Sequence, residues 1–134
     1  MRLFILDTSV LVDEFRTDRH RERISVLSGA VRNSAVVLAE LWRGARSKSD
    51  QNLLKALEKK AAVLAPTASN WLESGQILLS MGSDHGLQPQ KLRDLHFDIL
   101  IALTARSHGA TLITSNRRAF EMIHHYRPFS FEVW

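Results

Sequence analysis

The chain contains no cysteine among its 134 residues, which excludes disulfide bonds, thiolate metal sites and cysteine nucleophiles. It has no apolar stretch that approaches the length of a membrane span. Its first residues, 1–5, lead directly into a strand pattern without a signal-peptide cleavage site. None of the six histidines has the helical two-histidine spacing of a zinc protease. We therefore expect a cytoplasmic protein that uses none of these chemistries.

The length of the chain and its net charge predict the number of domains and the kind of partner. Residues 1–134 fit one domain with a continuous core. The net charge is +4, and the surface should be more basic than that if the inward-facing acids described below bind metal, which favours an anionic partner. A solvated charged face remains the alternative. The basic residues gather in three groups: Arg16, Arg19, Arg21 and Arg23; Arg43, Arg46 and Lys48; and Arg117, Arg118 and Arg127.

Apolar runs alternate with helical periodicity along the chain, which predicts an α/β fold with a parallel sheet. The expected strands are Leu3–Leu6, Val31–Asn33, Val63–Leu64, Thr111–Ile113 and Phe129–Val133. The expected helices are Ser9–Phe15, Arg19–Leu27, Ser34–Ala45, Ser49–Lys60, Thr67–Met81 and Arg93–Ser107, with a loop at Gly82–Pro89. Ligands of open parallel sheets bind beyond the carboxyl ends of the strands. We therefore expect Asp7 to lie beside Thr114–Asn116.

Three acidic residues occupy otherwise apolar elements. Asp7 follows the strand pattern of residues 3–6. Helical spacing places Glu40 on one face with Val36 and Val37, and it places Asp98 with Ile101 and Ala102. A buried ionised carboxylate is strongly disfavoured unless it is paired, hydrogen-bonded or bound to metal. Three inward acids therefore predict a shared cation, and oxygen ligands favour Mg²⁺ or Mn²⁺.

Each acid also has a simpler structural interpretation. Asp7 is a suitable N-cap for the helix that follows it. Glu40 is one helical turn from Arg43 and can form a surface ion pair with it. Asp98 is favourable near the start of a helix because of the helix dipole, and the same holds for Asp94 one turn earlier. Asp94 is also a candidate for an additional carboxylate at the site.

Four motifs follow one another along the chain: Leu6–Leu11, Leu38–Gly44, Phe97–Ala102 and Gly109–Asn116. In their order and spacing, the chain resembles a PIN-domain ribonuclease of the VapC toxin type over nearly its whole length. The resemblance implies a three-layer α/β/α PIN-like domain with a central parallel sheet. It also implies a Mg²⁺- or Mn²⁺-dependent endoribonuclease site, a small cognate antitoxin, and a homodimer.

Individual residues of this chain match positions of the family's motifs. Asp7, Glu40 and Asp98 match the first three acidic positions of the family, and Thr114 matches the threonine or serine before its last motif. Asn116 stands where many members have aspartate, and Ala119 stands where an aspartate often compensates. An asparagine can ligate metal or hold water, and it is also a natural N-cap. It adds no negative charge, so one or two metal ions remain possible.

The predicted chemistry is phosphodiester hydrolysis in RNA. Asp7 and Asp98 are the expected metal ligands, Glu40 is expected to orient or deprotonate the attacking water, and Asn116 completes the site. Basic residues around the rim would hold the RNA backbone. Three alternatives stay open: a catalytically weak RNA- or partner-binding module, a housekeeping RNA-processing nuclease, and an aspartyl phosphatase. The phosphatase would need a second aspartate at the position of Ser9.

Overall fold

A computed structural model describes all residues, 1–134, and its centre is a parallel sheet of five strands. The strand order is β3-β2-β1-β4-β5. The predicted parallel α/β sheet is confirmed, with every expected strand present within two residues of its predicted bounds. The strands are β1 Leu3–Leu6, β2 Ala30–Ser34, β3 Val63–Leu64, β4 Ala110–Thr114 and β5 Phe131–Val133.

The central strand, β1, is the point where the strand order changes direction. β2 and β3 follow on one side of β1, whereas β4 and β5 follow on the other side. Leu3 pairs with both Ala30 and Ala110, and Leu6 pairs with Ile113. β4 is buried along its whole length, which explains why its sequence is a continuous run of apolar and β-branched residues. A crevice is therefore expected where β1 and β4 end.

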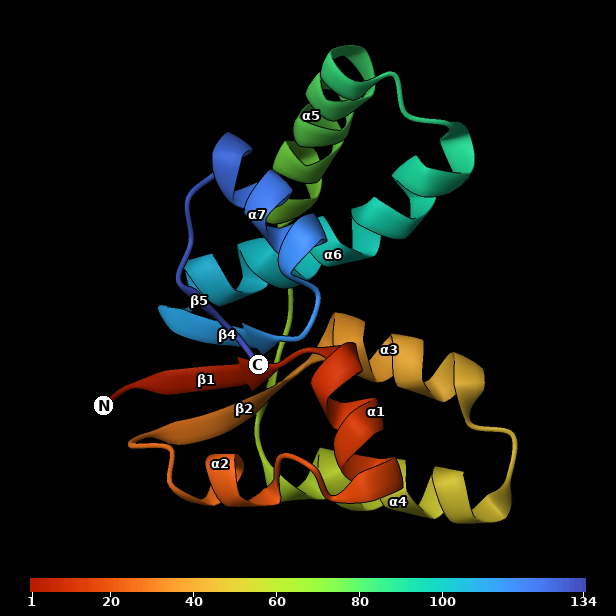
Figure 1. Ribbon diagram of the computed structural model, residues 1–134, viewed down its shortest axis with the longest axis vertical. Helices are drawn as coiled ribbons and strands as arrows, with labels where there is room; N and C mark the ends of the chain where they lie inside the picture. The colour runs from red at the N-terminus through yellow and green to blue at the C-terminus, as the bar shows by residue number, and fades with distance from the viewer.

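Seven helices surround the sheet, in agreement with the three-layer α/β/α architecture. In Figure 1, α5, α6 and α7 lie on one side of the strands, α1, α2 and α4 lie on the other side, and α3 lies beyond the strands' carboxyl ends. The helices are α1 Thr8–Thr17, α2 Arg21–Ser25, α3 Ala35–Gly44, α4 Lys48–Lys60, α5 Ala68–His85, α6 Pro89–Ser107 and α7 Arg117–Tyr126. No helix is long and apolar enough to cross a membrane.

The predicted loop at Gly82–Pro89 is wrong over most of its length. α5 continues through Gly82 to His85, and its C-cap is Gly86, whose φ of 60° lies in the left-handed region that glycine adopts without strain. Pro89 begins α6, because its fixed φ suits the first helical turn and its missing N–H has no helical partner there. The connection is reduced to residues 86–88. Asp98 therefore lies in the middle of a helix, which removes its interpretation as a helix-start residue.

α6 crosses the core of the molecule. Its residues 99–105 are all buried, and the helix packs against α5, α7, α3 and β4. The hydrophobic core joins this segment to the apolar side chains of β1 and β4 and to Phe120 of α7. Asp98 precedes the buried segment by one residue. Its position is thus fixed by the packing of a rigid element.

Candidate active site

Asp7 is held at the junction of β1 and β4. Its backbone N–H donates to the carbonyl of Ile113 at 2.8 Å, which extends the strand pairing by one residue. The residue is 4% exposed. Its Oδ2 accepts hydrogen bonds from Thr114 Oγ1 at 2.7 Å and from Ser9 Oγ at 3.0 Å. The side chain makes no cap hydrogen bond to α1, so capping does not explain this carboxylate.

Hydroxyl groups link the two strand ends around Asp7. The backbone N–H of Ser115 donates to Ser9 Oγ at 3.1 Å, and that of Asn116 donates to Thr114 Oγ1 at 3.0 Å. Asp7 therefore lies beside residues 114–116, as predicted. Burial raises the pKa of Asp7, and the hydrogen bonds from Thr114 and Ser9 oppose that rise. The network holds the carboxylate in one orientation.

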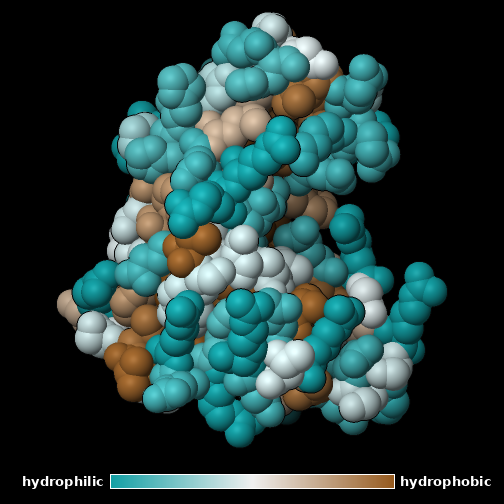
Figure 2. Space-filling model, in the orientation of Figure 1, coloured by the Kyte–Doolittle hydropathy of each residue, from teal (hydrophilic) through white to brown (hydrophobic).

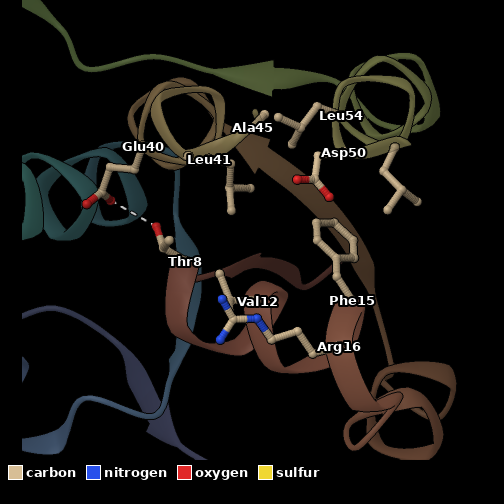
Figure 3. Close-up of a pocket in the computed structure, with 11 residues that line it drawn as sticks. Thr8, Val12, Phe15, Arg16, Glu40, Leu41, Ala45, Asp50 and Leu54 are labelled. Carbon is tan, nitrogen blue, oxygen red and sulfur yellow. Dashed lines mark hydrogen bonds between the residues drawn. The ribbon is translucent and has the colours of Figure 1, made fainter. Parts of the chain in front are cut away.

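Glu40 approaches the same region from α3. It is half-buried, and its Oε1 accepts a hydrogen bond from Thr8 Oγ1 at 2.9 Å, drawn as the dashed line in Figure 3. Burial raises the pKa of Glu40 and the negative charge of Asp7 raises it further, whereas Arg43 lowers it. Arg43 makes no ion pair within 4 Å. Its guanidinium instead lies 5.2 Å from the ring centroid of Phe97 on α6.

Asp98 on α6 is the most perturbed of the three acids. Burial, followed by the negative charges of Asp7 and Glu40, raises its pKa to about 7. The positive charge of Lys91, two helical turns earlier, acts in the opposite direction, and Asp94 adds to the rise. No hydrogen bond to the Asp98 carboxylate is present in the structure. β1, α3 and α6 thus bring three mutually repelling carboxylates together.

A cavity of about 520 Å³ opens between α3 and the first half of α6, and of the three acids Glu40 and Asp98 line it. In Figure 2 the surface is hollowed between the part formed by α5 and α6 and the part formed by α3 and α4, and the rim is largely hydrophilic. The exposed Asp94 lines the same cavity as Asp98, so it is within reach of the site. The lining residues are Glu40, Arg43, Gln90, Arg93, Asp94, His96, Phe97 and Asp98.

The donor set suits a hydrated divalent cation. The structure contains no group of three or more His, Asp or Glu side chains arranged to hold a metal ion, so the three acids do not form a closed set of ligands. Mg²⁺ keeps several of its waters and commonly uses only one or two carboxylates. Burial raises the pKa of Asp7, and burial together with the charges of Asp7 and Glu40 raises the pKa of Asp98. A nearby cation would favour the ionised form of both carboxylates. The residues at this edge therefore fit the predicted kind of metal ion.

Asn116 and Arg117 lie in surroundings that differ from those of the three acids. Asn116 is exposed, and its Oδ1 accepts from the backbone N–H of Ala119 at 3.4 Å as the N-cap of α7. Arg117 forms an ion pair with Glu121 at 3.0 Å and lines a separate cavity on α7. Asn116 therefore has a structural role at the end of β4, and Arg117 is not among the residues that line the acidic cavity.

Sequence reasoning gave no site role to Thr8, Ser9 or Lys91. Thr8 and Ser9 follow Asp7 directly, and their position after a strand end was the available signal. Lys91 precedes Asp98 by seven residues, which corresponds to two helical turns and one helix face. The predicted helix begins at Arg93 and leaves Lys91 outside it, whereas α6 begins at Pro89 and includes Lys91.

The fold and the site define an α/β domain with an acidic crevice at the carboxyl ends of its parallel strands. The model of the PIN domain family matches residues 4–124, and the chain therefore belongs to this family. PIN domains are generally nucleases and generally use divalent metals such as Mg²⁺. No curated protein matches the chain.

Several solved structures resemble the chain over nearly its whole length. A DNA-bound VapBC complex from Salmonella typhimurium has a chain with 26% identity and a TM-score of 0.76, with 100% of this chain and 99% of that chain covered. VapBC-1 from nontypeable Haemophilus influenzae gives 25% identity and a TM-score of 0.74, with 98% of each chain covered. VapBC2 from Rickettsia felis, bound to a promoter DNA fragment, gives 24% identity, a TM-score of 0.75 and the same coverage.

Proposed function

We propose that this protein is a divalent-metal-dependent endoribonuclease that hydrolyses RNA phosphodiester bonds and acts as the toxin of a toxin–antitoxin pair. The observation that carries the proposal is the meeting of Asp7, Glu40 and Asp98 at one edge of the sheet of a PIN domain. Glu40 and Asp98 line one cavity there, and burial together with the charges of Asp7 and Glu40 raises the pKa of Asp98. Perturbed carboxylates that gather in a cleft are characteristic of functional sites.

Asp7 and Asp98 would hold Mg²⁺ or Mn²⁺, which makes hydroxide available at neutral pH and neutralises charge on the phosphate. Thr114 and Ser9 orient Asp7 through the hydrogen bonds to its Oδ2. One Glu40 oxygen accepts from Thr8, which leaves the other free to accept a hydrogen bond from the attacking water. The raised pKa of Glu40 suits it to receive that proton.

The cationic side of the cavity would bind the RNA backbone. Arg43 and Arg93 line the same cavity as Glu40 and Asp98, and neither forms an ion pair within 4 Å. Their charges can therefore contact phosphates, which would make RNA binding dependent on salt. Unpaired segments are the favoured substrate, because their bases can turn away from the stack and enter protein pockets.

Cleavage of single-stranded RNA by the purified protein tests the proposal directly. Activity should require Mg²⁺ or Mn²⁺ and should stop on chelation. Water attack should leave a 5′-phosphate and a 3′-hydroxyl, which end-specific enzymatic labelling distinguishes from 2′,3′-cyclic phosphate. Cyclic ends, or full activity in chelator, would contradict the mechanism. An Asp7→Asn protein prepared in parallel controls for contaminating nuclease.

The toxin assignment is supported by the VapBC complexes that the chain resembles. We propose a small antitoxin partner whose tail enters the acidic crevice and blocks RNA or metal. Expression of the wild type alone should slow growth, whereas Asp7→Asn should be harmless and still bind the partner. Recovery of no small protein from the native host, together with harmless wild-type expression, would instead favour a housekeeping nuclease or a weak binding module.

A further inference from the structure

A second cavity, of about 300 Å³, lies between α1, α3 and α4 and begins at the Thr8–Glu40 hydrogen bond. Its size is at the lower end of the range for small-molecule sites. Figure 3 shows Glu40 and Thr8 at one end and Asp50 and Phe15 at the other, with Leu41 between them. The lining residues are Thr8, Val12, Phe15, Arg16, Glu40, Leu41, Gly44, Ala45, Asp50, Leu53 and Leu54.

The walls of this cavity are apolar and can pack against the flat face of an aromatic ring. Val12, Leu41 and Leu54 form the inner surface, and two large apolar side chains remain solvent-accessible at the rim, Phe15 at 39% and Leu53 at 43% exposed. Exposed aromatic side chains beside a nucleic-acid site are stacking surfaces, and every base has a π-face to stack on them. An RNA base therefore matches both the size and the walls of the cavity.

Two charged groups in the cavity have no partner. The Asp50 carboxylate forms neither a hydrogen bond nor an ion pair, although the backbone N–H of Asp50 donates to Ser47. Arg16 also lacks a partner. The other arginines of its group are engaged, since Arg19 pairs with Asp13, Arg21 pairs with Asp18, and Arg23 lies over the Trp134 ring. In Figure 3 the Arg16 side chain runs back along α1 toward Thr8.

We propose that this cavity binds one unpaired RNA base next to the cleaved bond and prefers guanine. Guanine presents two adjacent donors, N1–H and the N2 amino group, which match the two oxygens of Asp50. Adenine places an acceptor, N1, beside its single amino group, and uracil has one donor between two acceptors. The nucleotide's phosphate would then lie toward Arg16, at the end of the cavity next to the acidic crevice. The inference rests on the proposed RNA-cleaving function but identifies the base that the site reads.

Equilibrium binding measures this preference without cleavage. In an Asp7→Asn background, a fluorescein-labelled oligouridine with one central guanine should bind about tenfold more tightly than the same RNA with adenine at that position. Asp50→Asn, added to that background, should reduce the ratio to near one. Glu22→Gln removes the same charge from an exposed position on α2 and should leave the ratio unchanged.

A second variant keeps the test decisive if Asp50→Asn folds poorly. Phe15→Leu retains apolar volume and removes the ring, so it should weaken binding of every base by about fivefold while the guanine preference persists. Mapping of cleavage sites on RNAs with randomised loops should show cuts next to guanine for the wild type and no base preference for Asp50→Asn. Thermal unfolding of each variant identifies those that are folded.

The outcomes separate this inference from the proposed function. Guanine-selective binding that depends on Asp50 supports the base pocket, even if the wild type cleaves no RNA. Equal binding of all bases, or a preference that survives Asp50→Asn, overturns the pocket, even if cleavage is robust. If Asp50→Asn leaves the base preference intact and weakens only the complex with the antitoxin, the cavity belongs to the protein partner and the inference is wrong.

Discussion

At the β1–β4 edge of the crevice, Asp7 receives two side-chain hydrogen bonds, from Thr114 and Ser9. On the facing helices, Glu40 receives one from Thr8, and Asp98 receives none. The strand side therefore fixes its carboxylate with neutral hydroxyl donors. The helix side carries negative charge that a cation can offset and that protonation of Asp98 can remove. The comparison indicates that the orientation of Asp7 is fixed, whereas the charge of Asp98 depends on pH and, under the proposed function, on metal.

Asp7→Asn should have the largest effect on activity, because it removes a proposed metal ligand and places an amide where two hydroxyls donate. We expect RNA cleavage to fall by about 100-fold or more, since even the loss of groups that merely support a ligand commonly costs 10- to 100-fold. Initial rates at saturating Mg²⁺, compared with the wild type, provide the measurement. Full activity in a nuclease-free preparation would remove Asp7 from the site.

Two variants at Thr114 test the hydrogen bond that orients Asp7 without changing Asp7 itself, the proposed metal ligand. Thr114→Ser keeps the hydroxyl that donates to Asp7, whereas Thr114→Val keeps the shape and removes it. The valine variant should lose activity and the serine variant should retain most of it. Equal losses in both variants would mean that packing at the end of β4, and not the hydrogen bond, determines the activity.

Asp98 should govern how the stability of the metal-free protein depends on pH. Its pKa is about 7 in the fold and near 3.8 when the chain is unfolded. Between these values the folded protein holds a proton that the unfolded chain has released, so the free energy of unfolding should decrease as pH rises from about 4 to 7. The stabilisation is complete below pH 4 and is lost above pH 7.

Asp98→Asn should remove most of this dependence. At pH 8 and without metal, we expect the variant to be more stable than the wild type by about 1–2 kcal/mol, because it no longer carries a third negative charge. Mg²⁺ should stabilise the wild type at pH 8 more than at pH 5 and should have little effect on the variant. Urea unfolding at the two pH values checks both expectations. A variant with the wild-type pH profile would show that Asp98 does not carry the shifted pKa.

The sequence predicts the strand side of the crevice better than the helix side. β1 and β3 have their predicted bounds, and the rule that ligands bind beyond the carboxyl ends of parallel strands correctly places Asp7 beside Thr114. Such predictions need only apolar periodicity and the rules of parallel sheets. The start of α6 was missed because a proline and two glycines resemble a loop, although Gly82 is accommodated within α5.

Side-chain partners between separate elements lie beyond sequence patterns. The Thr8–Glu40 hydrogen bond joins residues 32 positions apart, and no periodicity relates α1 to α3. The free charges of Arg16 and Asp50 are likewise visible only once the partners of the neighbouring arginines are known. The sequence indicates which residues are charged. The packing of the helices decides which of those charges remain available to a ligand.

Asn116→Asp should produce the smallest effect and would show whether the strand side can take more charge. Asn116 Oδ1 accepts from the N–H of Ala119, and aspartate caps helices about as well as asparagine. The added charge is also favourable at the N-terminus of α7. The stability of the metal-free protein should therefore change by less than about 0.5 kcal/mol.

The Mg²⁺ concentration for half-maximal cleavage should decrease roughly threefold if residue 116 faces a metal ion, because affinity follows ligand charge. Asn52→Asp adds the same charge on the exposed surface of α4 and controls for net charge. If both variants show the wild-type metal titration, residue 116 serves only as the cap of α7.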